Sequence, residues 1–263
     1  MTTPTYLEKK NPHERDSHIT FEEKAHKYTI DGEDDFLSVT TWNHGHFEKF
    51  NADKIIDKMM SGKNWTKSKY YGQTKEEIKK LWNDNGRLSA EQGTQMHYDI
   101  ECFYNKMEVE NDSIEYQYFQ NFYNDHKQMT PYRTEWMIWD KDHKLAGSID
   151  MIFENEDETL SIYDWKRSKE IKKQNRWQHA KTECIAHLPD CNYMHYCLQL
   201  NTYKKIIETK YGKKVKDMYL VCLHPNNSNK NYQKIKVLNM GIEMDNLFDE
   251  RKKQLKNPFA AFK

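Results

Sequence analysis

The sequence has no excess of charge and no long apolar segment, and each absence excludes a class of protein. Its 41 Lys and Arg residues equal its 41 Asp and Glu residues, so the formal net charge is zero. A global positive field does not draw this chain to nucleic acid, and any such site requires local clustering of charge. No apolar run approaches the roughly 20 residues of a membrane span, and the N-terminus lacks the apolar region of a signal peptide.

Cysteine is also scarce, and the chain has no internal repeat and no low-complexity linker. The five cysteines lack the spacing of a disulfide framework, which favours reduced thiols and an intracellular location, in the cytoplasm or nucleus. Aromatic residues make up 13% of the chain and argue against disorder, because their side chains supply much burial per residue. The 263 residues suit one large domain, or one domain with an extension.

The pattern of apolar residues predicts an α/β fold with a central mixed sheet flanked by helices. A hairpin is expected first, with Lys27–Ile30 and Phe36–Thr40 joined at Asp31-Gly32. The further expected strands are 132–140, 146–153, 160–166, 217–223 and 234–238, and the expected helices are 52–60, 74–83, 89–104, 113–126, 193–211 and 240–255. Residues 1–86 would form an N-terminal hairpin and helical extension that narrows a cleft, and residues 87–263 the core.

Two acids and a lysine are expected to meet on one face of the central hairpin. If the second and third strands of the meander fold about residue 157, partners sum to 314, so Asp150 lies opposite Asp164 and Ile152 opposite Ile162. Lys166 lies on the same face, two residues beyond Asp164. A slip of one residue would put the two acids on opposite faces.

Two neighbouring carboxylates repel each other unless one takes up a proton or a cation lies between them. Oxygen ligands of this kind are what Mg²⁺ and Mn²⁺ prefer. The alternative is a solvated face, with Lys166 in a surface salt bridge. The flanking isoleucines favour a partly buried face.

Four motifs in order resemble the PD-(D/E)xK nuclease superfamily, and its RecB-like exonuclease branch in particular. They are Gly93-Thr94-Gln95-Met96-His97, Gly147-Ser148-Ile149-Asp150, Asp164-Trp165-Lys166 and Gln199-Leu200-Asn201-Thr202-Tyr203. Mitochondrial genome-maintenance exonucleases and many viral nucleases are similar. The resemblance covers residues 87–223, about half the chain, and it implies a restriction-endonuclease-like core.

The resemblance also implies a role for each matching residue. His97, Asp150 and Asp164 match metal ligands, with the backbone carbonyl of Trp165 as a further oxygen, and one or two Mg²⁺ or Mn²⁺ ions are expected. Lys166 matches the catalytic lysine, which orients or activates the attacking water and offsets charge at phosphorus. The remaining matches are supporting residues: the helix pair Gln199 and Tyr203, which position Lys166 and the DNA backbone, and the accessory acids Glu135 and Glu101.

The activity implied is metal-dependent hydrolysis of DNA phosphodiester bonds, by a sequence-nonspecific exonuclease in DNA processing, repair or recombination. An endonuclease of the same fold and a catalytically silent nucleic-acid-binding protein are the alternatives. An assembly protein, with the acids as surface charge, is a further one. Strand preference, polarity and RNA as a substrate stay open.

A basic segment follows the proposed catalytic lysine directly. From Lys166 to Arg176 it holds six basic residues and one acid, a net charge of +5. Such a cluster neutralises phosphates without reading sequence, and the DNA-binding candidates are Arg167, Lys169, Lys172, Lys173 and Arg176. The alternative is an ordinary solvated loop.

A second group of possible metal ligands consists of Cys184, His187, Cys191, His195 and Cys197. It lacks two tight Cys-x-x-Cys pairs, which argues against structural zinc. Some RecB-like relatives hold an iron–sulfur cluster with cysteines after the Gln-x-x-x-Tyr helix. Here only Cys222 follows Gln199, which argues against a cluster.

Overall fold

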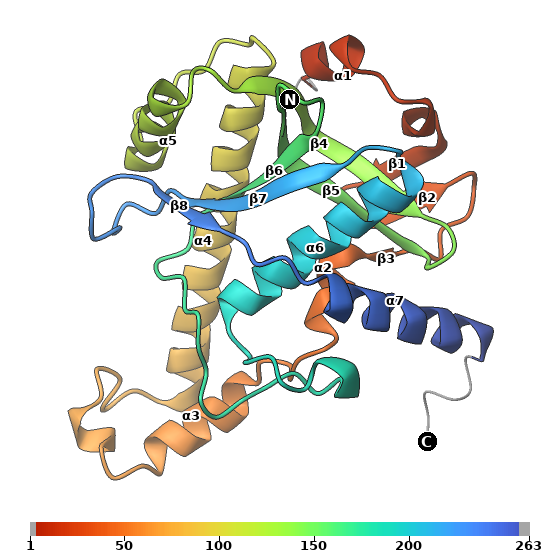
Figure 1. The fold of residues 1–263 in the computed structure, drawn as a ribbon. Helices are drawn as coiled ribbons and strands as arrows, with labels where there is room; N and C mark the ends of the chain where they lie inside the picture. The colour runs from red at the N-terminus through yellow and green to blue at the C-terminus, as the bar shows by residue number, and fades with distance from the viewer. Residues whose placement is uncertain (1–3, 258–263) are drawn as a thin grey trace.

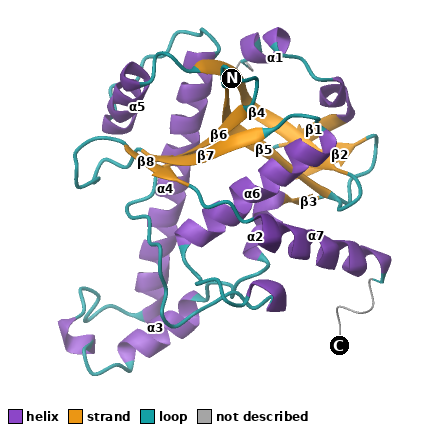
Figure 2. Ribbon diagram, viewed as in Figure 1, coloured by secondary structure: helices purple, strands orange, loops and turns teal. Residues whose placement is uncertain are grey.

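A mixed sheet lies at the centre of the molecule, with helices on both sides (Figures 1 and 2). The computed structural model describes residues 4–257, so the ends of the predicted extension and core, 1–3 and 258–263, lie outside it. In the described residues this sheet has six strands, in the order β3-β5-β6-β7-β8 with β4 along the other edge of β5. Its strands are β3 (Leu37–Ser38), β4 (Thr130–Asp140), β5 (Leu145–Glu154), β6 (Leu160–Lys166), β7 (Val215–Cys222) and β8 (Gln233–Lys236).

The helices divide between the two faces of this sheet. They are α1 (Tyr6–Lys10), α2 (Val39–His44), α3 (Ala52–Met60), α4 (Lys75–Tyr104), α5 (Ile114–Asp125), α6 (Asn192–Lys210) and α7 (Gly241–Lys256). Helix α6 shares one apolar cluster with Ile152 and Ile162, whereas α4 and α5 share another with Met151 and Tyr163. The alternation of side chains along β5 and β6 thus gives each face its own core. The α/β fold with a mixed sheet and flanking helices is confirmed.

The predicted register of the central hairpin is confirmed as well. Ile152 pairs with Ile162 in the antiparallel ladder between β5 and β6. Both side chains lie in the same cluster as α6. The ladder ends at the pair Met151–Tyr163, so Asp150 and Asp164 lie directly beyond its last pair, one on each strand.

The predicted N-terminal hairpin is wrong in its partner strand. Lys27–Ile30 is strand β2, but it pairs with β1 (Ile19–Glu22). Leu37–Ser38 instead pairs in parallel with the start of β5, and Ser38 Oγ accepts a hydrogen bond from the backbone N–H of Thr41, which starts helix α2. The partner of Leu37–Ser38 is set by contact with β5, which is distant in the sequence. The turn residues Asp31-Gly32 therefore could not predict it.

The two helices predicted over residues 74–83 and 89–104 are one continuous helix, α4. It begins as expected, with a reciprocal capping box between Thr74 and Glu77. The polar stretch before Gly86 contains no proline, and a single interior glycine costs only about 1 kcal/mol. The expected boundary at residue 86 therefore falls inside a helix, and the division into two units stays a prediction.

The N-terminal half of α4 and helix α3 project away from the sheet (Figure 1). The two helices are joined by ion pairs, with Lys75 Nζ 2.8 Å from Asp57 Oδ1 and Lys79 Nζ 3.0 Å from Asp53 Oδ1. Among residues 4–257, none of the helices combines the length and apolar character required to traverse a bilayer.

Candidate metal and catalytic site

Strands β5 and β6 separate at one end, and the predicted site residues lie in the fork between them. The β5–β6 ladder ends at the pair Met151–Tyr163, while β6 stays paired with β7 as far as Lys166. Beyond the last pair, the N–H of Trp165 has no partner strand on the β5 side. Asp150 takes its place, because its Oδ2 accepts that hydrogen bond at 2.9 Å. The end of the ladder thus holds one of the predicted carboxylates.

His97 reaches the same fork from helix α4. Its Nε2 lies 2.9 Å from the carbonyl oxygen of Trp165, and its Nδ1 lies 3.5 Å from Asp150 Oδ2. A carbonyl only accepts hydrogen bonds, so Nε2 carries a proton and Nδ1 is the nitrogen that faces the carboxylates. In this arrangement the Trp165 carbonyl, expected as a metal ligand, instead fixes the orientation of His97.

Glu135 is the third group at the fork, and its backbone is strained. Its φ of +42° lies in the left-handed region, inside strand β4. A residue with a Cβ adopts this conformation at a cost of about 1–2 kcal/mol. The register of β4 with β5 puts Glu135 opposite Asp150, and Ser148 Oγ donates to Glu135 Oε2 at 2.8 Å. Surrounding contacts therefore hold this side chain in a defined place despite the strain.

Together, His97, Glu135 and Asp150 offer three ligand atoms that all lie within 4.8 Å of one another. Two carboxylates and a neutral imidazole suit Mn²⁺, and the carboxylates suit Mg²⁺. The pKa of Glu135 is raised by burial and by the charge of Asp150. Glu101, one helical turn after His97, has its pKa raised to about 7 by burial and by the charge of Glu135. Both shifts favour the protonated carboxyls, and a cation bound at the fork would oppose them.

Lys166 and Asp164 form a buried ion pair beside this group. Nζ and Oδ2 are 2.6 Å apart, and the side chains are 17% and 3% exposed. Burial raises the pKa of Asp164 to about 6, against the pull of Lys166, and Asp150 adds to the rise. Burial alone would lower the pKa of Lys166, but Asp164 and Asp150 outweigh it and the pKa is raised. Lys166 is therefore an ammonium at neutral pH.

Asp164 is not among the three residues whose ligand atoms converge. Its Oδ2 is buried and, within residues 4–257, accepts no hydrogen bond of good geometry. Its one close partner is the ammonium of Lys166, in the ion pair described above. Glu135, expected as an accessory acid, belongs to the converging group instead. The structure therefore brings His97, Asp150 and Glu135 together, with Asp164 and Lys166 as a neighbouring pair.

Helix α6 supplies the side chains behind the lysine. Gln199 Nε2 donates to Tyr203 Oη at 3.2 Å, so the expected i,i+4 pair is in contact. A Cβ at Gly147 would lie 2.8 Å from Tyr203 Cε1, which explains the glycine of the Gly-x-x-Asp motif. The ring centroid of Tyr196 lies 4.7 Å from Lys166 Nζ. The sequence analysis missed Tyr196, although its spacing of three and seven residues from Gln199 and Tyr203 puts all three on one helix face.

A cavity of about 720 Å³ opens beside Glu101 and Glu135. Strands β1 and β2 form its other wall, and further acids from the N-terminal part line it, namely Glu8, Asp16 and Glu23. Arg133 also lines the cavity and is paired with Asp16, but the acids outnumber this cation, so a nucleic-acid backbone is expected to approach from another side.

The basic loop, residues 167–177, lies between β6 and α6 and offers that side. Arg167 is not available there, because its Nε lies 2.6 Å from Glu115 Oε1 in a largely buried pair. The remaining candidates are exposed: Lys169, Lys172, Lys173 and Arg176. Lys172 Nζ lies 3.8 Å from Glu170 Oε2, an exposed contact that holds it weakly.

No protein-family model and no curated protein matches this chain. The geometry of the fork and the motifs in the sequence are therefore what bears on the function of this chain.

Proposed function

We propose that this chain is a metal-dependent DNA nuclease with a restriction-endonuclease-like core. The observation that carries the proposal is the fork between β5 and β6. There, ligand atoms of His97, Glu135 and Asp150 lie within 4.8 Å of one another, next to the Lys166–Asp164 pair. An acid cluster alone is ordinary, but an imidazole whose Nδ1 faces two acids, with its Nε2 bonded to a carbonyl, is the arrangement of a metal ligand set.

The residues of the fork would divide the chemistry among them. A bound Mg²⁺ or Mn²⁺ lowers the pKa of a coordinated water and offsets charge on the scissile phosphate. His97, Asp150 and Glu135 would hold that ion, with Asp164 and Glu101 at its margin. The carbonyl of Trp165 keeps the imidazole in the tautomer that binds metal.

Lys166 would act as a fixed positive charge. It lies against Asp164 and the ring of Tyr196, so it stays an ammonium and keeps one position. A positioned cation orients the attacking water and stabilises the charge that develops on the phosphate oxygens. Tyr196 contacts the lysine directly, and Gln199 and Tyr203 are bonded to each other farther along the same helix, with Tyr203 against Gly147.

The proposed substrate is DNA, attacked from its ends without sequence preference. The exposed cations of the basic loop follow Lys166 directly and suit phosphate contacts, which carry no sequence information. The exonuclease mode comes from the resemblance to the RecB-like branch, and an endonuclease is the alternative. Linear and closed circular DNA, each single- and double-stranded, separate the two, since an exonuclease leaves closed circles intact.

The proposal is tested by Asp164→Asn and Lys166→Met, assayed on end-labelled linear DNA with Mg²⁺ and with Mn²⁺. We expect cleavage to fall at least 100-fold in each variant, because a group acting on the transition-state charge contributes about that much. Lys166→Met preserves most of the side-chain volume. The carboxyl of Asp164, left without its cation, can take up a proton, so no unpaired buried charge remains and this variant should fold.

The matched control is Asp157→Asn, which removes an exposed carboxylate from the turn between β5 and β6. It should cleave like the parent chain. Thermal melting with and without Mn²⁺ shows which variants are folded. Undiminished cleavage by folded Lys166→Met would refute the assignment, and the absence of cleavage in the parent chain would favour a silent binding protein.

A further inference from the structure

We propose that Trp177, at the end of the basic loop, is a stacking platform for an unpaired base of single-stranded DNA. The inference rests on the proposed nuclease function and deepens it by naming the form of the substrate. It assigns the loop a role beyond phosphate contact, which sequence analysis did not foresee.

The first observation is the exposure of this indole. Trp177 is 88% exposed, whereas the other six tryptophans of the chain are buried or half-buried. Tryptophan offers a large apolar surface, so most chains bury it. A single exposed apolar side chain is common, however, and exposure alone assigns no role.

The second observation is that hydrogen bonds hold the loop in place around this indole. Asn175 Oδ1 accepts from the backbone N–H of Trp177 at 3.0 Å and from that of Gln178 at 3.2 Å. Asn175 Nδ2 donates to the carbonyl of Asp190 at 2.7 Å, which ties the loop to the segment before α6. The backbone at Trp177 is therefore anchored, so less conformational freedom is lost when a base stacks on the ring.

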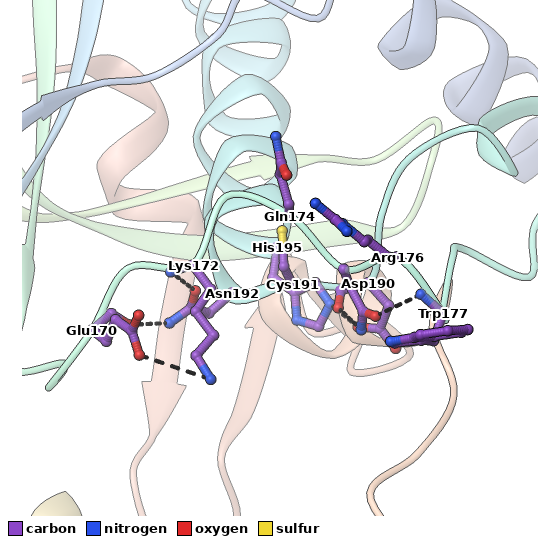
Figure 3. A pocket seen from close by; sticks show the side chains of 10 residues that line it. Glu170, Lys172, Gln174, Arg176, Trp177, Asp190, Cys191, Asn192 and His195 are labelled. Atoms are coloured by element: carbon purple, nitrogen blue, oxygen red, sulfur yellow. Dashed lines mark hydrogen bonds and ion pairs between the residues drawn. The ribbon is translucent and has the colours of Figure 1, made fainter.

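The third observation is the cavity beside the ring, which has a volume of about 690 Å³ (Figure 3). This is within the range of about 300–1,000 Å³ that small-ligand sites occupy. In Figure 3, Lys172 lies at one side of the cavity and Arg176 with Trp177 at the other, and His195 lies between them. The cavity is also lined by the acids Glu170 and Asp190, which are paired with Lys172 and His195. Lys172 and Arg176 on opposite sides can contact the phosphates on either side of a nucleotide.

Helix α6 connects the cavity with the proposed catalytic lysine. His195 lines it, and the following residue of α6, Tyr196, carries the ring that contacts Lys166. Asn192 also lines it, and its side-chain Nδ2 donates to the carbonyl of Glu170 at 2.7 Å. A strand whose phosphate lies at Lys166 can therefore continue along the basic loop and α6 to the cavity and stack one of its bases on Trp177.

The indole selects single-stranded DNA because of how bases are arranged in a duplex. In a duplex each base face is covered by the adjacent base pair, so only an unpaired base or a frayed end offers its π-face. Arg176 beside Trp177 and Lys172 across the cavity add attraction for the backbone without reading the base. The expected occupant is thus a single strand of any sequence.

The test measures binding of a fluorescent single-stranded oligonucleotide and of a blunt duplex of the same sequence, both without divalent metal so that no cleavage occurs. Trp177→Ala should weaken single-strand binding about 5- to 150-fold, the range expected from the loss of one stacked base. Trp177→Phe should recover most of that loss, because a phenyl ring still stacks. Duplex binding should change less than threefold.

The matched control is Ile242→Ala, which removes another highly exposed apolar side chain, 77% exposed, from helix α7. It should bind both oligonucleotides like the parent chain. Equal single-strand affinity of Trp177→Ala and the parent chain would overturn the inference, as would an equal loss for single strand and duplex.

The assay also separates this inference from the proposed function. If Lys166→Met cleaves normally but Trp177→Ala loses single-strand affinity, the catalytic assignment fails and the stacking platform stands. If Lys166→Met is inactive but Trp177→Ala binds normally, the nuclease stands and the platform is refuted. If Trp177→Ala weakened binding of an RNA oligonucleotide but not of single-stranded DNA, the proposal for DNA would also be refuted.

Discussion

At the fork, the ionised forms of Glu101 and Glu135 lower the stability of the folded chain, because the pKa of each carboxyl is raised. Glu101 has its pKa raised to about 7 from the ordinary value of 4.5, by burial and by the charge of Glu135. A carboxyl with a raised pKa binds its proton more tightly in the folded chain. Its contribution to stability is therefore present below pH 4.5 and is lost as the pH rises through 7.

We expect Glu101→Gln to stabilise the metal-free protein at pH 8 by about 1–2 kcal/mol, after discounting the shift for partial exposure of the side chain. The gain should be small near pH 4.5 and grow up to pH 7, because only the ionised form is penalised. Urea unfolding of both chains at a series of pH values measures it. A gain that does not depend on pH would show that charge is not the cause.

How far the sequence predicts individual residues depends on whether their positions follow from local pattern. The register of the central hairpin follows from strand period and turn position, and the pairing of Ile152 with Ile162 confirms it, whereas the ladder ends before Asp150 and Asp164. The positive φ of Glu135 and the exposure of Trp177 do not follow, because both depend on segments distant in the chain. Patterns of neighbouring residues in the sequence therefore cannot predict these two features.

Helix α4 is the element that links the projecting arm to the fork, and it contains two glycines, Gly86 and Gly93. The sequence predicted its start at Thr74 correctly, because a capping box is a local signal. It predicted a break near Gly86, because polar residues beside a glycine resemble a loop. The helix continues since no proline interrupts its hydrogen bonds.

Replacing either glycine by alanine should stabilise the protein by about 0.5–1 kcal/mol, because both lie in a helix interior and an added Cβ meets nothing within 4 Å. The two should differ in DNA affinity. Gly93 lies one turn before His97, where a substrate backbone is expected to approach, so Gly93→Ala should weaken DNA binding while Gly86→Ala should not. Thermal unfolding and binding of the labelled oligonucleotide test both statements. Equal DNA affinity of the two variants would show that Gly93 does not face the substrate.

Across the whole molecule, a net charge of zero conceals a separation of charge around the fork. Acids line the cavity beside Glu101 and Glu135, whereas exposed cations follow Lys166 in the basic loop. Composition alone showed only that no global field exists, and the fold shows on which side of the site the local field lies. Steering of DNA to the fork therefore depends on a few side chains.

This separation predicts the salt dependence of DNA binding. Replacing Lys172, Lys173 and Arg176 by alanine should lower the slope of log affinity against log salt by about 2–3, because each phosphate contact releases about 0.7–0.9 counterion. The control replaces three exposed lysines of helix α7, namely Lys252, Lys253 and Lys256, by alanine. It changes the net charge by the same amount, so any effect of total charge appears in both variants, while only the first removes contacts at the fork. Fluorescence anisotropy between 50 and 200 mM salt gives both slopes. If the two variants lose equal slope, the basic loop does not carry the DNA, and the path of the strand must lie elsewhere on the molecule.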